Sequence, residues 1–271
     1  EQHLWGPRGY YKAPYYTNNI AKFVSEIGYH GCPNRESLEK MFDKKFVYPW
    51  TNKKDFKWND QWQTKAVRSH PYATETIKRN DLMTNQIKCV FTKVPTDLDQ
   101  FIVASQIIQA EAKKYFIEFW RMNKGERNGI LWWNLRDGWP VISDAIVDYY
   151  YSKKLAYHYI KRVQTDVCIM IGDAQEKGHP VVIVNDTLKE VESHFSIKDL
   201  DTKKILINKK FQIGKNGKLR EGFLPKTTAP KLWLIEWSVG NKKYTNHYFA
   251  FQPQVDLKVY LNWLPKLKPN K

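Results

Sequence analysis

The sequence predicts an α/β segment followed by an all-β domain, and two observations support this division of its 271 residues. Up to about residue 162, short apolar runs bounded by glycine and proline alternate with helical patterns, as in β/α units. From about Val163 onward, short runs of β-forming residues follow one another with turn signals between them. We therefore expect two domains, residues 1–162 and residues 163–271, and a chain of this length can hold both.

The first clear strand of the α/β segment ends at a carboxylate. Phe23 and Val24 form a short β-forming run, Glu26 follows it, and Gly28 and Gly31 then break the chain. This pattern predicts that Glu26 lies at the carboxyl end of a strand. In a (β/α)₈ barrel that end carries the catalytic groups. The alternative interpretation is a solvated charge at a strand end.

The following elements continue the β/α pattern. A long helix is predicted from Asp97 to a stop at residues 123–125, because apolar residues recur every three to four positions. The other expected elements are a helix over residues 37–42 behind Asn34, an irregular surface stretch over residues 45–72, a strand over residues 131–133 and a helix over residues 153–162. Two such β/α units cannot close a barrel of eight.

The second domain is expected to be an immunoglobulin-like sandwich. About six short strands bounded by turns, within roughly 90 residues, are typical of that architecture. The predicted strands are residues 167–171, 181–185, 191–197, 205–213, 232–238 and 244–251. A short helix or turn over residues 257–264 ends the chain.

The composition excludes several classes of partner. The net charge is +16, but the lysines are scattered singly and in pairs, which favours a basic solvated surface over a nucleic-acid site. No run approaches the ~20 apolar residues of a membrane span, so we expect no membrane partner. Cys32, Cys89 and Cys168 form no disulfide framework and no Cys-x-x-Cys pair, and no spacing suggests a metal site. We expect no metal and no other cofactor.

Four ordered blocks resemble the end of the catalytic barrel in family-two glycoside hydrolases, especially their β-mannosidase-like branch. Residues 22–33 resemble the block around the family's nucleophile, including its Ser-Glu pair, and residues 129–140 resemble the last barrel strand with its terminal Trp-Pro. Residues 147–159 and 245–248 are similar to the family's "I-D-Y-F-G-x-x-K-A-L-H-Y" and "S-N-H-Y". Residues 3–6 resemble a further segment, "H-Y-W-G".

This resemblance implies a retaining exo-β-glycosidase that acts on a carbohydrate substrate. Glu26 matches the nucleophile. The family's acid/base glutamate follows an asparagine, and no Asn-Glu pair occurs here. We therefore expect the C-terminal part of a (β/α)₈ barrel, an immunoglobulin-like domain, and an upstream remainder that supplies the acid/base. The candidate substrate-binding residues are His3, Trp5, Trp133, Asp137 and Trp139. For Asp137, a role in holding its turn is an equal alternative.

Departures from the family pattern leave the substrate open. Arg136 replaces an asparagine of the family, and residues 30–32 differ just after the nucleophile. A β-mannosidase is favoured, with β-galactosidase, β-glucuronidase and exo-β-glucosaminidase as alternatives. A non-catalytic module that binds carbohydrate or a polyanion is the alternative outside this class. If the source degrades polysaccharide, a periplasmic or extracellular location is favoured.

Overall fold

The computed structural model describes residues 2–66 and 79–267. The chain divides into two compact units. The first comprises Glu1–Tyr115 and Ile130–His158, and the second comprises Phe116–Gly129 and Tyr159–Lys271. The long helix α5 (Leu98–Met122) therefore contributes residues to both units. It was predicted at nearly these bounds.

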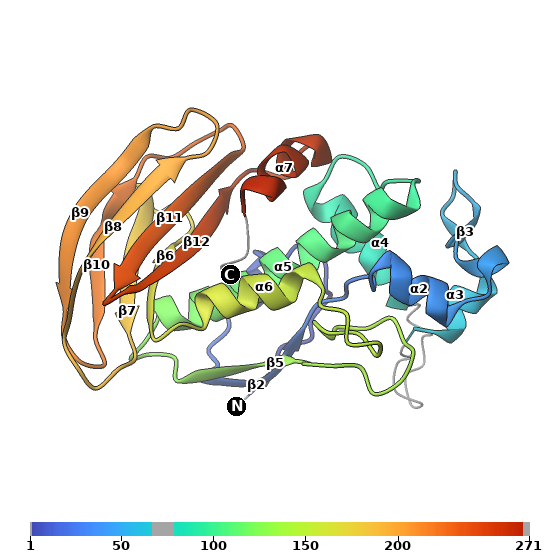
Figure 1. The fold of residues 1–271 in the computed structure, drawn as a ribbon, viewed down its shortest axis with the longest axis horizontal. Coiled ribbons are helices and arrows are strands. Elements are labelled where there is room, and N and C mark those ends of the chain that lie inside the picture. Colours follow the sequence, from blue (N-terminus) through green and yellow to red (C-terminus); the bar gives the residue numbers. More distant parts are fainter. Residues whose placement is uncertain (1, 67–78, 268–271) are drawn as a thin grey trace. The chain divides into compact units, whose positions relative to one another are not determined.

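The first unit contains a three-stranded sheet in the order β1-β2-β5. Its strands are β1 (Gln2–His3), β2 (Phe23–Gly28) and β5 (Gly129–Trp133). Figure 1 labels β2 and β5. Strands β1 and β2 are parallel, and the pairing places His3 opposite Glu26. The helices besides α5 are α1 (Pro14–Thr17), α2 (Arg35–Met41), α3 (Asp60–Thr64), α4 (Arg79–Val90) and α6 (Leu155–Val163), the last ending in the second unit. This sheet brings the two family-like strands together.

The expectation of an irregular surface stretch over residues 45–72 is wrong for its described part. The short 3₁₀ helix Lys44–Phe46, the hairpin β3 (Trp50–Asn52) and β4 (Lys57–Trp58), and helix α3 occupy it. Trp50, Trp58 and Trp62 are buried, and Trp50 packs edge-on against Phe101 of α5 with 4.8 Å between ring centroids. Burial of large aromatic rings stabilises these short elements. Residues 67–72 lie outside the described part.

The second unit is built of two antiparallel sheets that are arranged as in a sandwich. One sheet has the order β10-β7-β6 and the other the order β12-β11-β8-β9 (Figure 1). The strands are β6 (Val167–Ile171), β7 (His179–Asn185), β8 (Val191–Asp199), β9 (Ile205–Ile213), β10 (Lys218–Leu224), β11 (Lys231–Val239) and β12 (Lys242–Ala250). Helix α7 (Leu257–Trp263) and a 3₁₀ turn (Leu264–Lys266) follow. Strand β10 was not predicted.

Strands β6 and β7 are buried along their whole length, on both faces. One face packs toward the sandwich core. Within the unit, the end of α5 lies against the strands: Asn246 of β12 donates through Nδ2 to Glu118 Oε1 (2.7 Å) and to the Ile169 carbonyl (2.9 Å). Asn246 is fully buried. Its amide thus joins β12, β6 and α5, which gives a structural role to one of the family-like blocks.

Replacing Asn246 by alanine should lower the free energy of unfolding of the second unit by about 1–3 kcal/mol, because a buried acceptor loses its donor. Chemical denaturation followed by circular dichroism measures this change. Asn208→Ala is the matched control, since Asn208 lies exposed on β9. Equal effects of the two substitutions would contradict the prediction.

Among the described residues, no helix has the length and apolar character that a membrane crossing requires.

Candidate active site

The carboxylate of Glu26 is held by two residues of the β1 segment. The Trp5 indole donates through Nε1 to Glu26 Oε2 at 2.8 Å, and His3 Nδ1 lies 3.5 Å from the same oxygen. The parallel pairing of β1 with β2 creates this arrangement, because it sets His3 beside Glu26. About 30% of the Glu26 side chain is exposed. The carboxylate is therefore oriented and still accessible.

Trp133 ends strand β5 and lies close to the same group. Its ring meets the Trp5 ring edge-on, with 6.4 Å between centroids and 72° between planes. Trp133 is 49% exposed. The Lys113 ammonium of α5 donates to its backbone carbonyl. The structure thus brings together Glu26, His3, Trp5 and Trp133, four of the residues that the sequence singled out.

The two remaining candidates lie in the loop after β5. Trp139 is half exposed there. Asp137 is buried, and it accepts a hydrogen bond from Ser143 Oγ at 2.5 Å, while its amide donates to the Val147 carbonyl at 3.2 Å. Burial raises the pKa of its carboxyl. These contacts favour a role for Asp137 in holding the loop.

A buried charged cluster contacts Trp5 through Arg8, and sequence reasoning missed it. Arg8 donates through Nη1 to both Asp144 oxygens, at 3.2 and 3.4 Å, and His30 Nδ1 lies 2.8 Å from the same nitrogen. Burial opposes the charge on Asp144, but His30 and Arg8 outweigh it and hold the pKa of that carboxyl well below its usual range. Burial lowers the pKa of His30. The Asp144 carboxylate and the His30 ring therefore both lie within hydrogen-bond distance of the same Arg8 nitrogen.

Long polar side chains tie the segments after β2 and β5 to each other. Lys154 is fully buried and donates to the carbonyls of Gly31 (2.8 Å) and Ser143 (3.3 Å). Gln109 of α5 donates to the carbonyls of Tyr29 and Asp144, both at 3.0 Å. These side chains thus supply hydrogen-bond donors to backbone carbonyls. Lys154 lies in a family-like block, and that was the only sequence signal for this role.

Lys113 should make the stability of the first unit depend on pH. Burial lowers its pKa to about 7, further lowered by Lys154 and Arg8 and partly restored by Asp144. An unfolded lysine titrates near ~10.4. Between these two values the unfolded chain binds a proton that the folded chain does not. The free energy of unfolding therefore rises with pH in this window, by up to ~1.4 kcal/mol per unit, and the gain is lost as the pH falls to about 7.

Urea denaturation of the wild type and of Lys113→Met at pH 7 and pH 9 measures this dependence. The wild type should gain stability relative to the variant at the higher pH. Lys153→Met alters an exposed lysine, and its stability should change between pH 7 and pH 9 by the same amount as that of the wild type. Parallel pH dependence of the wild type and Lys113→Met would contradict the expectation.

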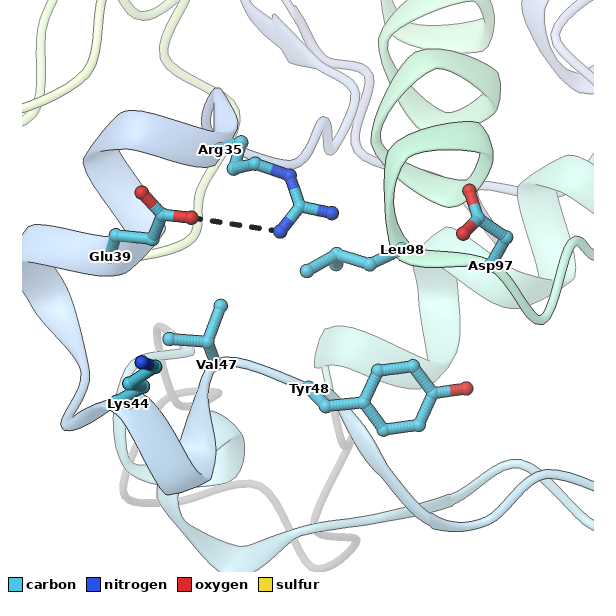
Figure 2. A pocket seen from close by; sticks show the side chains of 7 residues that line it. All are labelled: Arg35, Glu39, Lys44, Val47, Tyr48, Asp97 and Leu98. Atoms are coloured by element: carbon cyan, nitrogen blue, oxygen red, sulfur yellow. Dashed lines mark ion pairs between the residues drawn. The ribbon is translucent and has the colours of Figure 1, made fainter.

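Two surface pockets of the first unit help to define the site. One, of about 510 Å³, includes His3 with Tyr15 and Asn19 and so adjoins the Glu26 group. The other, of about 670 Å³, lies between α2 and the start of α5 (Figure 2). It is lined by Arg35, Glu39, Lys44, Val47, Tyr48, Asp97 and Leu98. This second pocket includes none of Glu26, His3, Trp5 and Trp133. We therefore place the candidate active site at Glu26 and not at this pocket.

The part of the chain that the structure describes contains no cluster of three or more histidine, cysteine, aspartate or glutamate side chains that could hold a metal ion.

No protein-family model matches the chain. It is 30% identical over 152 residues to beta-mannosidase B of Aspergillus niger, which covers 55% of this chain and 16% of that protein. The corresponding protein of Aspergillus terreus is 28% identical over the same length. The chain thus spans about one sixth of the length of these curated relatives.

Solved structures agree with these relatives. The β-D-mannosidase of Dictyoglomus thermophilum superposes with a TM-score of 0.70 at 25% identity, covering 87% of this chain and 28% of that one. An exo-chitosanase of Amycolatopsis orientalis has a TM-score of 0.57 at 16% identity, covering 84% and 27%, and supports the fold alone. The resemblance of this chain to the β-mannosidase-like branch of family-two glycoside hydrolases is therefore confirmed.

Proposed function

We propose that this chain is the nucleophile-bearing, C-terminal part of a retaining exo-β-glycosidase with a preference for β-mannosides. The observation that carries the proposal is the Glu26 carboxylate, which is accessible on β2 and held at Oε2 by the Trp5 indole. Its agreement with the family's nucleophile block and the similarity to β-mannosidases support it. On this proposal, the three-stranded sheet belongs to a (β/α)₈ barrel whose other strands lie upstream.

The geometry at Glu26 suits nucleophilic attack. Retaining glycosidases use two carboxyl groups ~5–5.5 Å apart, one attacking the anomeric carbon and the other protonating the leaving oxygen. Trp5 and His3 both face Oε2, and among the described residues none donates a hydrogen bond to Oε1. We assign Oε1 the attack that forms the glycosyl–enzyme ester. The upstream remainder of the protein supplies the acid, which then acts as a base for water in the second step.

Aromatic rings beside Glu26 supply the sugar contacts in this proposal. Trp133 presents half of its surface at the end of β5, and its neighbour Trp5 lies between it and the carboxylate. Flat indole faces pack against the C–H faces of a pyranose ring. Trp139, half exposed in the next loop, is a further contact that we propose. A polyanion-binding module gives no reason for two tryptophans to meet beside a glutamate.

The full-length protein provides the test. We expect it to hydrolyse aryl β-mannosides faster than the matching β-galactosides, β-glucuronides and β-glucosaminides. Proton NMR of the first product should show the β-anomer before mutarotation. The α-anomer would contradict a retaining mechanism. A preference for another glycoside would contradict the mannoside assignment, and turnover of none of them would favour the binding module.

A further inference from the structure

A continuous line of contacts joins Glu26 to the buried charged cluster. Glu26 accepts a hydrogen bond from the Trp5 indole at 2.8 Å. The Arg8 guanidinium lies over the Trp5 ring, with Cζ 4.3 Å from its centroid. Arg8 in turn donates to Asp144. Each of these four residues contacts the next. The position of Asp144 can therefore affect the orientation of the Glu26 carboxylate through Arg8 and Trp5.

Gly28 makes the close packing of Trp5 possible. A Cβ atom at this position would lie only 2.5 Å from Trp5 Cζ3 and 2.9 Å from Asp144 Oδ1. The indole therefore rests on bare backbone of β2, two residues beyond Glu26. Because Arg8 also packs against the ring, the orientation of the Trp5 indole is restricted, and with it the direction of the indole N–H.

The arrangement at Arg8 is costly to maintain. Its side chain is buried, and its φ of 46° lies in the left-handed region that residues other than glycine rarely adopt. Removing an ion pair from water carries a desolvation penalty for each ion, and such pairs are weak evidence for stability. Residues held in unfavourable backbone conformations concentrate at functional sites. A role in the chemistry of the neighbouring carboxylate accounts for these costs better than stability does.

We propose that Arg8, fixed by Asp144, is a positioning residue that holds the Trp5 indole on Oε2 of Glu26 and thereby keeps Oε1 directed for attack. This inference rests on the proposed role of Glu26 as the nucleophile. His30 Nδ1 lies 2.8 Å from the same Arg8 nitrogen, Nη1, and adds a second contact to the guanidinium. Arg8 acts through Trp5, so its effect on the reaction should vanish when the indole N–H is absent.

A double-mutant cycle in the full-length protein tests this coupling. The probe is a 2-deoxy-2-fluoro-β-glycosyl fluoride of the preferred sugar, and the readouts are the rate of inactivation and the mass of the labelled peptide. Fluoride leaves without help from an acid, so the labelling rate reports on the nucleophile. Trp5→Phe and Arg8→Lys should each slow labelling by about tenfold, the size expected for losing a hydrogen bond to a charged group. The double variant should be no slower than Trp5→Phe alone.

Arg121→Lys is the matched control, because Arg121 also pairs with an aspartate, Asp186, in the second unit. It should leave the labelling rate unchanged. If Arg8→Lys does not fold, as judged by thermal melting, Asp144→Asn takes its place in the cycle. Labelling of Glu26 with additive effects of the two substitutions would overturn the positioning role alone. No label on Glu26 in the wild type would overturn the proposed function and this inference with it.

Discussion

Replacing Glu26 by alanine in the full-length protein is expected to abolish turnover of an aryl β-mannoside, and added azide is expected to restore part of it. On our proposal, the substitution removes the group that forms the covalent intermediate. Loss of a nucleophile costs on the order of 10⁴-fold or more in kcat. Azide can enter the space that the carboxylate leaves and attack the anomeric carbon directly. The product should then be an α-mannosyl azide, because a single displacement inverts the configuration.

Two comparisons make this result specific. Glu39→Ala removes an exposed glutamate of α2 that pairs with Arg35 at 3.6 Å, and it should retain full activity. Azide should not accelerate the wild type or this control. Release of aryl alcohol followed by absorbance, and of glycosyl azide followed by NMR, are the measurements. Wild-type activity in Glu26→Ala would remove Glu26 from the nucleophile role.

The elements that the sequence predicted are those with a strong local pattern. Residues 205–213 contain a run of β-forming residues followed by a glycine turn, and the long helix repeats its apolar residues along 25 positions, so both were found at or near their bounds. Strand β10 carries lysine, arginine, glutamate and Gly222, which are not β-forming residues, so it lacks such a pattern. Helix α4 is polar over much of its length, and its buried face includes Asn80 and Gln86. Tertiary contacts, which a local pattern does not contain, decide such elements.

The residues of the candidate site also fall into those that a local sequence pattern predicts and those that it does not. Glu26, Trp5 and Trp133 were found because each stands in a local block that resembles a known family. The Arg8–Asp144 pair joins residues that are 136 positions apart, and no local pattern links them. Lys113 lies on helix α5, and a lysine in a helix predicts exposure. The fold buries it instead and gives its ammonium the Trp133 carbonyl as an acceptor. Sequence reasoning therefore misses the residues that hold the site residues in place through contacts distant in the sequence.

The 271 residues expressed alone are expected to show no glycosidase activity, although they carry Glu26. On our proposal the acid/base belongs to the upstream remainder, and general acid catalysis contributes about 10²–10⁴-fold. The missing barrel strands would also provide most of the pocket that holds the sugar. Positioning of reacting groups can account for ~7–11 kcal/mol of a barrier. Both losses act on the same transition state, so the remaining rate should fall below detection.

The assay compares this chain with the full-length protein on aryl β-mannoside, β-galactoside and β-glucuronide, with circular dichroism to establish that the chain is folded. Ile20 and Leu131 are exposed, so association of the chain is an expected side effect, and detergent-free size exclusion measures it. Inactivity of a folded chain supports an upstream acid/base. Turnover that disappears in Glu26→Ala of the chain would instead mean that both carboxyl groups lie within these residues. The acid would then have to be sought among the carboxylates of the first unit, and the alignment to the end of a barrel would be wrong.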